Sequence, residues 1–228
     1  MKNGAGKIGA FLDVDKTILS ENSGTLYLRA LYDRGEVEWT TLLANLGSYV
    51  QYKLNLLDIE RWTKQTMRQF RGRRERDLEE ESAPWFREYV LPTIYPEALE
   101  LVRMHQGRGH VVALVSGATR FVVQPVAEHL GVNHLMYTHM EVKEGALTGR
   151  VIDPICFGEG KVYWLQQLIE GEGIDLARSY FYTDSITDLP LLELVGHPQV
   201  VNPDPLLYRA AVKRRWPVRF FKDPSLSA

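Results

Sequence analysis

The sequence predicts an α/β protein: a doubly wound parallel sheet into which a helical domain is inserted after the first strand. Short apolar runs alternate with helical patterns over most of the chain, which favours parallel strands covered by helices on both faces. Residues 22–94 lack this alternation and carry helical spacing instead. The composition, 45% hydrophobic and 25% charged over 228 residues, is typical of a globular protein large enough for one domain with an insert.

Five apolar segments are expected to form the sheet, each followed by a turn or helix signal. The first covers residues 7–14 and carries a carboxylate near its end. The others cover residues 110–116, 134–141, 179–184 and 198–202. Helical patterns separate the later strands, over residues 119–130, 158–171 and 189–195. With strands numbered along the chain, we expect the Rossmann-like order 3-2-1-4-5, which reverses between the first and fourth strands.

The insert is expected to be helical, because its apolar residues recur at helical spacing. These residues are Leu26, Ala30, Leu31, Leu42, Leu46, Tyr49 and Val50. Asp58 is the predicted N-cap of a helix through Met67, and Pro96 suits the first turn of the helix that returns the chain to the sheet. The resulting division gives a core domain of residues 1–21 and 95–228 and an insert of residues 22–94.

Two smaller features follow from charge and turn patterns. In the insert, a basic cluster is followed by acidic residues 79–81, and we interpret it as a solvated helix face whose charges pair with one another. The cluster consists of Arg71, Arg73, Arg74 and Arg76. Residues 142–151, with Glu144 and Gly145 at their centre, predict a β-hairpin beside the main sheet.

Charge and cysteine content restrict the expected partners and location. With 27 Lys and Arg against 29 Asp and Glu, the net charge of −2 gives no reason to expect nucleic acid or an anionic membrane as a partner. Cys156 is the only cysteine, which fits a reducing cytoplasm, and we expect it to be a small buried residue rather than a catalytic thiol. No signal peptide and no apolar run of about 18 residues is found, so a cytoplasmic protein is expected. The oligomeric state is not predicted.

The first candidate for chemistry is a pair of carboxylates at the end of the first strand. Asp13 and Asp15 lie two residues apart, so both face one crevice only if the chain turns sharply after Asp13. Like charges held close together raise a pKa or recruit a metal, and oxygen ligands of this type suit Mg²⁺. Alone, the pattern formed with Thr17 also occurs in ordinary turns and helix caps.

Two further segments suggest an anion site. Ser116 and Gly117 close the second strand and open a helix, where backbone amides bind anions, although Ser116 alone would be taken for a helix cap. Lys161 lies near the start of a helix, an unfavourable place for a cation unless negative charge lies nearby. By itself it would equally well be an exposed lysine. A cluster of carboxylates and phosphate would supply the missing charge.

The last segment adds two more carboxylates. Asp184 ends the fourth strand and Asp188 follows four residues later. In the expected sheet order, Asp13 and Asp184 both lie where the order reverses, which is where doubly wound sheets bind ligands.

Together, these four segments resemble motifs I to IV of the haloacid dehalogenase superfamily, specifically its subfamily IB, the phosphoserine-phosphatase-like group. The resemblance spans nearly the whole chain, and the insert is similar to that family's cap domain. It implies a magnesium-dependent phosphatase in which Asp13 attacks phosphorus to form an aspartyl-phosphate and Asp15 is the general acid and base. The presence of Asp15 favours a phosphatase over a dehalogenase, because an ester oxygen needs a proton to leave and a halide does not.

The resemblance also implies the remaining site residues. The phosphoryl group would be held by Thr17, Ser116, Gly117 and Lys161. Asp188 would orient Lys161 or a metal-bound water. Mg²⁺ would be held by Asp13, the backbone carbonyl of Asp15 and Asp184.

The substrate remains open among several alternatives. Phosphoserine phosphatases have a glutamate nine residues after the nucleophile, where this chain has Asn22, with Glu21 one position earlier. We therefore favour an unspecified small organic phosphomonoester and retain phosphoserine, recognised through Glu21, as an alternative. A phosphotransferase or phosphomutase of the same fold would use the same motifs. A non-catalytic binding module is the remaining possibility.

Overall fold

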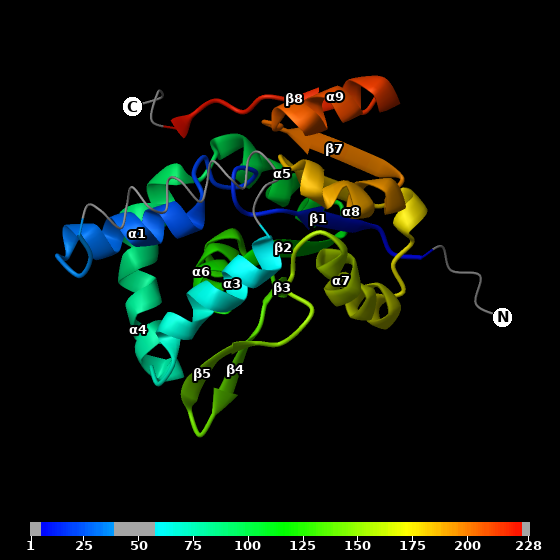
Figure 1. Cartoon of the computed structure of the whole chain (residues 1–228). Helices are drawn as coiled ribbons and strands as arrows, with labels where there is room; N and C mark the ends of the chain where they lie inside the picture. Colours follow the sequence, from blue (N-terminus) through cyan, green and yellow to red (C-terminus); the bar gives the residue numbers. More distant parts are fainter. Residues whose placement is uncertain (1–5, 39–57, 225–228) are drawn as a thin grey trace.

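A computed structural model describes residues 6–38 and 58–224, and in them a parallel sheet forms the centre of the molecule (Figure 1). Its strands lie in the order β3-β2-β1-β6-β7-β8. They are β1 Gly9–Leu12, β2 Val111–Thr119, β3 His134–Thr138, β6 Tyr180–Thr183, β7 His197–Val201 and β8 Val218–Arg219. All pairings in this sheet are parallel, so the predicted fold class and the order of the first five strands are confirmed. The two-residue strand β8 was not predicted, since it is too short to show a period.

Four helices of the α/β part match the predicted segments closely: α5 Pro96–Gly107, α6 Arg120–Leu130, α7 Glu159–Glu172 and α8 Leu189–Leu194. A further helix, α9 Pro205–Arg214, follows β7. Pro96 occupies the first turn of α5 as predicted, and α6 ends at Gly131, whose φ of +64° closes the helix. Helix α9 was missed, although Asp204 accepts hydrogen bonds from the Leu206 and Leu207 amides as its N-cap.

Apolar cores lie on both faces of the sheet. Alternate residues of β1 point to opposite faces: Leu12 joins the core under α5 and α6, and Phe11 joins the core under α7, α8 and α9. Both side chains are fully buried. This two-sided burial explains why the strands are continuous apolar runs in the sequence.

A buried network of neutral polar groups lies on the face covered by α5. His105, which is 0% exposed, has its Nδ1 atom 2.8 Å from Nδ1 of His110 and its Nε2 atom 2.9 Å from the Tyr182 hydroxyl. Burial lowers the pKa of His105 to about 4, and burial likewise lowers the pKa of His110. We refer to His105, His110 and Tyr182 as the histidine network. It is uncharged at neutral pH.

The described part of the insert is helical. It comprises α1 Ser23–Asp33, α3 Ile59–Met67, α4 Glu75–Trp85 and the short helices η1 Arg68–Phe70, η2 Phe86–Val90 and η3 Leu91–Thr93. Asp58 caps α3 by accepting a hydrogen bond from the Arg61 amide at 3.0 Å, as predicted. The predicted spacing of Leu42, Leu46, Tyr49 and Val50 lies outside the described residues. No described helix has the length and apolar character needed to cross a membrane.

The basic cluster of the insert pairs largely with its own helix, as expected. Arg73 contacts Glu81 at 2.5 Å, and two pairs follow the helical spacing. These are Arg74 with Asp77 and Arg76 with Glu80. Most of these side chains are substantially exposed, so each pair contributes little to stability.

The predicted hairpin forms, with strands β4 Met140–Lys143 and β5 Ala146–Val151 around a turn at Glu144 and Gly145. It makes a separate two-stranded sheet, and its free side pairs with the insert rather than with the main sheet. The Gly72 amide donates to the Leu147 carbonyl, the Leu147 amide to Arg73, and the Glu75 amide to Gly145, at 2.8 to 3.0 Å. The hairpin is thus joined to the insert through main-chain hydrogen bonds.

Candidate active site

The loop after β1 places two carboxylates at one end of the sheet. The Asp13 amide still donates to the Tyr182 carbonyl of the neighbouring strand at 2.9 Å. The chain then turns, because the amides of Ile18 and Leu19 both donate to the Val14 carbonyl. Lys16, with φ of 62°, adopts a left-handed conformation within this turn. This is the sharp turn that the spacing of the carboxylates required.

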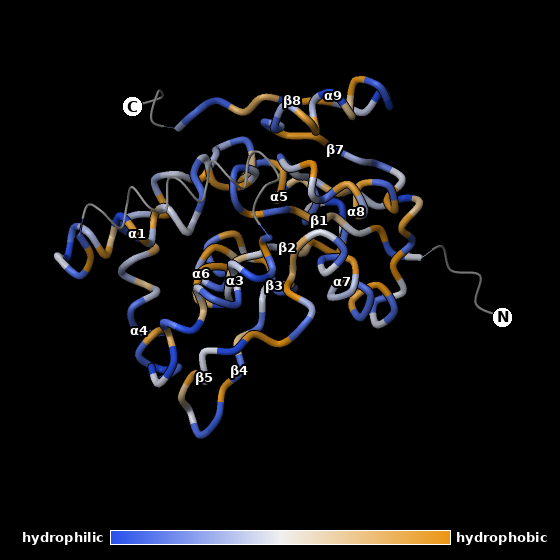
Figure 2. Tube along the Cα trace, viewed as in Figure 1, coloured by the Kyte–Doolittle hydropathy of each residue, from blue (hydrophilic) through white to orange (hydrophobic). Residues whose placement is uncertain are grey.

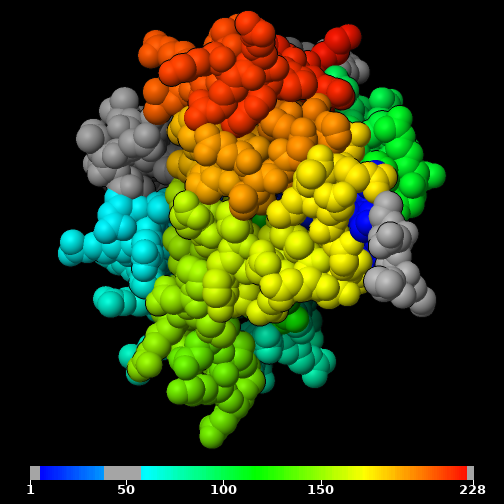
Figure 3. Space-filling model, turned by 90° about the vertical axis from the view of Figure 1, so that its right-hand side faces the viewer, coloured from blue at the N-terminus to red at the C-terminus, as the bar shows by residue number. Residues whose placement is uncertain are grey.

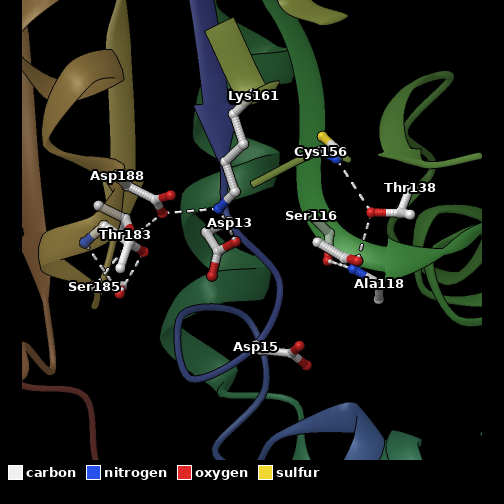
Figure 4. A network of polar contacts seen from close by, with 12 residues as sticks. Asp13, Asp15, Ser116, Ala118, Thr138, Cys156, Lys161, Thr183, Ser185 and Asp188 are labelled. Carbon is white, nitrogen blue, oxygen red and sulfur yellow. Dashed lines mark hydrogen bonds and ion pairs between the residues drawn. The ribbon is translucent and has the colours of Figure 1, made fainter. Parts of the chain in front are cut away.

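Lys161 joins two of the predicted carboxylates (Figure 4). Its ammonium lies 2.5 Å from Oδ1 of Asp13 and 2.8 Å from Oδ2 of Asp188, and the lysine is 3% exposed. Helix α7 supplies the lysine from its first turn, as predicted. The negative charge expected near this lysine is therefore present.

Asp188 is fixed by a residue that sequence reasoning missed. The Thr183 hydroxyl donates to Oδ2 of Asp188 at 2.6 Å, the oxygen that Lys161 also contacts. The other oxygen, Oδ1, is buried and has no hydrogen-bond partner among the described residues. Its free lone pairs suit a further donor, such as a water molecule. We refer to Asp13, Lys161, Thr183 and Asp188 as the lysine network.

The C-terminal end of β2, residues 116–119, is held by a second threonine that was not predicted. The Thr138 hydroxyl, at the end of β3, donates to the Gly117 carbonyl at 2.8 Å and accepts from the Cys156 amide at 3.2 Å. Within the segment, the Ala118 amide donates to the Ser116 hydroxyl at 3.1 Å, so Ser116 closes a local turn. The strand extends to Thr119 and the helix begins only at Arg120, slightly later than predicted.

Two buried side chains near this site differ in whether they are available to a bound ligand. Thr17 is 1% exposed and its hydroxyl has no hydrogen-bond partner among the described residues, which leaves it available to a bound ligand. Cys156 is 0% exposed, and burial raises the pKa of its thiol to about 12. The thiol is therefore protonated at neutral pH and is a packing residue, as expected.

Negative charge is in excess around Lys161. Burial raises the pKa of Asp13 to about 7, Lys161 opposes this rise, and the charge of Asp188 adds to it. Burial also raises the pKa of Asp15. Burial acts to lower the pKa of Lys161, but the attraction of Asp13 and Asp188 outweighs it, so the pKa of Lys161 is raised. One ammonium thus faces several carboxylates, and an additional cation would stabilise their ionised forms.

Asp15 is held at the start of α1. The Ser23 amide donates to its Oδ1 atom at 2.7 Å, and Nδ2 of Asn22 lies 3.5 Å from its other oxygen. Asn22 also caps α1 by accepting from the Thr25 amide at 3.3 Å. Its side chain therefore has a structural role, while Glu21 lines a separate cavity of about 420 Å³ beside α1.

The donor set fits magnesium by its chemistry. Asp13 and Asp184, 6% and 7% exposed, follow the neighbouring parallel strands β1 and β6, so two buried carboxylates leave the same edge of the sheet. In the described ranges no group of three or more His, Cys, Asp or Glu side chains forms a metal cluster. Mg²⁺ requires fewer, because it usually retains several waters beside one or two carboxylates.

Known proteins resemble this chain over nearly its full length. The family model described as haloacid dehalogenase-like hydrolase matches residues 10–193. A protein described as a probable phosphatase from Mycobacterium tuberculosis is 34% identical over 96% of this chain and 77% of its own length. A histidinol-phosphatase from Neisseria meningitidis is 32% identical over 93% of this chain and 98% of its own.

A solved structure gives the same fold. The phosphoserine phosphatase determined as an analogue of its phospho-aspartyl intermediate superimposes with a TM-score of 0.71. It covers 96% of this chain and 95% of its own, at 20% sequence identity. The α/β sheet with its helical insert is thus the architecture of that enzyme.

Proposed function

Because the chain belongs to the haloacid dehalogenase-like hydrolase family, we propose that it is a magnesium-dependent phosphatase acting on a small organic phosphomonoester. The observation that carries the proposal is the buried contact of Lys161 with Asp13 and Asp188. It keeps a carboxylate at a strand end in one orientation, as an attacking nucleophile requires. The unpartnered Thr17 hydroxyl supports a phosphoryl site beside it.

In the proposed reaction, a carboxylate oxygen of Asp13 attacks phosphorus and the bond from phosphorus to the ester oxygen breaks. Asp15 gives its proton to the departing oxygen, which leaves as an alcohol. A water molecule then attacks the phosphorus of the aspartyl-phosphate while Asp15 takes up its proton. Inorganic phosphate leaves and the Asp13 carboxylate is restored. The raised pKa of Asp15 suits a group that must first donate a proton.

The remaining residues would bind the phosphoryl group and balance its charge. Thr17, Ser116, the Gly117 amide and Lys161 would contact its oxygens, with Asp188 orienting Lys161. Asp13, the backbone carbonyl of Asp15 and Asp184 would hold Mg²⁺, which when bound supplies positive charge that offsets repulsion between nucleophile and phosphate.

Residues 22–94 would act as a cap over this site, and residues 1–21 and 95–228 would form the core domain. The enzyme would act in the reducing cytoplasm.

A second candidate substrate class is an amino-alcohol phosphate. Histidinol phosphate, named in one relative, carries an amine on the carbon next to its phosphorylated CH₂ group, as phosphoserine does. Because Asn22 is occupied as a helix cap, Glu21 is the remaining candidate partner for that amine, and its side chain, which here lines the cavity beside α1, would have to turn toward Asp15 to reach it.

A phosphate-release screen tests the proposal. The panel should include an aryl phosphate, phosphoserine, histidinol phosphate and their deamino analogues, each with and without Mg²⁺. We expect Mg²⁺-dependent release of inorganic phosphate, and we expect Asp13→Asn to remain folded with activity reduced by about 10³-fold or more, since an amide does not attack phosphorus.

Several outcomes would change the assignment. Near-normal turnover in Asp13→Asn would exclude the covalent mechanism. Transfer of phosphate to an added alcohol in place of release to water would indicate a phosphotransferase. A loss in Glu21→Gln restricted to the amine-bearing substrates would support the second candidate class, and equal rates with the deamino analogues would reject it.

A further inference from the structure

Residues 205–222, here called the C-terminal surface, differ in charge from the rest of the chain. They comprise α9, the turn after it, β8 and the residues that follow. They include six cationic and no anionic residues: Arg209, Lys213, Arg214, Arg215, Arg219 and Lys222. The whole chain has a formal net charge of −2, so the remaining residues carry a net charge of −8. The near-neutral total therefore hides a strongly basic segment.

All six cationic side chains are exposed. Among them, only Arg214 forms an ion pair with a described residue, Glu193 at 2.7 Å, and its guanidinium also lies over the Trp216 ring. The other five cations thus have no ion-pair partner among residues 6–38 and 58–224. Figure 3 shows α9 and β8, in orange and red, as an outer surface at the top of the molecule.

Apolar side chains are exposed among these cations. Helix α9 is anchored by Leu207 and Ala211, which are fully buried, so its opposite face points outward. The exposed apolar residues of the surface are Leu206, Tyr208, Val212 and Phe220, at 43%, 46%, 58% and 69%. The Tyr208 and Phe220 rings lie 6.5 Å apart, so α9 and the residue that follows β8 contribute to one patch. Figure 2 shows hydrophobic and hydrophilic residues interspersed along both elements.

We propose that the C-terminal surface docks on a membrane that contains anionic phospholipid. Lysine and arginine side chains near such a membrane are attracted by its negative surface potential, and each adds to binding. Exposed leucine, valine and phenylalanine beside them enter the boundary between headgroups and acyl chains. The negative charge of the remaining chain disfavours approach by its other faces, so it orients the protein with α9 toward the lipid.

Other partners fit the surface less well. Single-stranded nucleic acid would use the cations and would find stacking surfaces on Tyr208 and Phe220, but it would leave aliphatic Leu206 and Val212 exposed to water, whereas a membrane buries them. Strand addition to the sheet edge is disfavoured because β8 has only two residues. The docking proposal is independent of the phosphatase assignment, since none of the proposed catalytic or metal-binding residues lies in residues 205–222.

Co-sedimentation of the full chain with vesicles tests the proposal. We expect binding to phosphatidylcholine vesicles that contain phosphatidylglycerol, little binding to pure phosphatidylcholine, and weaker binding as salt is raised. Arg209→Glu/Lys213→Glu/Arg215→Glu should lower the vesicle partition coefficient by about tenfold or more. Val212→Ser/Phe220→Ser should lower it as well, because the inserted apolar area is lost.

The matched control reverses three exposed arginines elsewhere, Arg87→Glu/Arg103→Glu/Arg150→Glu, and should bind as the wild type does. The circular dichroism spectrum and the urea-unfolding midpoint should be unchanged in all three variants, which verifies that they fold without relying on the phosphatase assignment. Equal losses in control and test variants would overturn the proposal, as would equal binding to both kinds of vesicle. Tight binding to an oligonucleotide with none to anionic vesicles would instead assign nucleic acid.

Discussion

The lysine network and the histidine network both bury polar groups beside the same strand. They differ in the interactions that compensate these groups for the loss of contact with water. Adjacent residues of β6 take part in them: Tyr182 points to the face of α5 and joins the histidine network, while Thr183 joins the lysine network. The histidine network satisfies its atoms with neutral hydrogen bonds. The lysine network holds ionised groups with an excess of negative charge.

This difference distinguishes polar groups that are buried as part of the fold from polar groups that are buried to bind a ligand. A neutral network costs little once each donor has an acceptor, whereas a buried ion pair repays its desolvation only with good geometry. Stability alone does not explain an orphaned oxygen on Asp188 or an orphaned hydroxyl on Thr17. We infer that a ligand completes the lysine network, while the histidine network is already complete.

The largest expected effect comes from removing the cation of the lysine network. Lys161→Met leaves Asp13 and Asp188 buried without their counter-ion, so we expect the free energy of unfolding to fall by about 3–5 kcal/mol and activity to be lost. Urea titration monitored by circular dichroism measures the first. The destabilisation should be larger at pH 8 than at pH 5, because the carboxylates are ionised at the higher pH. A loss independent of pH would show that packing of the lysine stem dominates.

The corresponding change in the histidine network is smaller, and its effect on stability also shrinks as the pH falls, here because the histidine itself takes up a proton. His105 has a pKa of about 4 when folded and an ordinary value near 6.5 when unfolded, so the unfolded state binds more protons between these values. The stability this histidine contributes is complete above about pH 6.5 and is lost as pH falls toward 4, by up to about 3 kcal/mol.

His105→Phe tests this linkage, because phenylalanine fills the site without titrating. The variant should be less stable than the wild type at pH 8, by about 1–3 kcal/mol for the partners left unpaired, and the difference should shrink as the pH is lowered. Urea titrations at several pH values measure it. Activity at pH 8 should change little. A stability difference that stays constant from pH 8 to 4.5 would contradict a buried neutral His105.

The smallest expected effect refines the comparison within the active site itself. Thr138→Val removes one hydroxyl that joins the Gly117 carbonyl to the Cys156 amide. We expect kcat/KM to fall by about tenfold. The lost hydrogen bond helps to orient residues 116–119, and a loss of transition-state stabilisation near 1.4 kcal/mol corresponds to that factor. Inhibition by inorganic phosphate should weaken in parallel. Thr138→Ser keeps the hydroxyl and should retain most activity; equal damage by both substitutions would assign the role to the methyl group.

The fold and the charged members of the site follow from the sequence for a physical reason. Strands buried on both faces are continuous apolar runs, and Asp13 comes where such a run ends. Its distance from Lys161 is fixed by the sheet order rather than by local pattern, so the order and the four segments together predicted that negative charge lies near this lysine.

The two threonines that support the site were not predictable in the same way. Thr138 reaches Gly117 because β3 pairs with β2 in a register that shifts before Thr119, and sequence patterns do not specify that register. Thr183 reaches Asp188 only through the turn between them. His105 and His110 lie five residues apart, in α5 and the turn after it, but Tyr182 joins them from the distant strand β6, which no local spacing predicts. Helix α9 was predictable, because Asp204 and Pro205 form a typical helix start in the sequence.

The joint between the β4–β5 hairpin and the insert is made by backbone atoms at Gly72, Arg73 and Glu75. Such a joint depends little on which side chains its residues carry, provided that proline and shifts of register are avoided and that glycine is kept at Gly72, whose φ of +84° other residues rarely adopt. Most side chains of the insert can therefore change while its main-chain attachment to the hairpin is kept. In the proposed cap, substitutions that alter substrate specificity would leave this attachment intact.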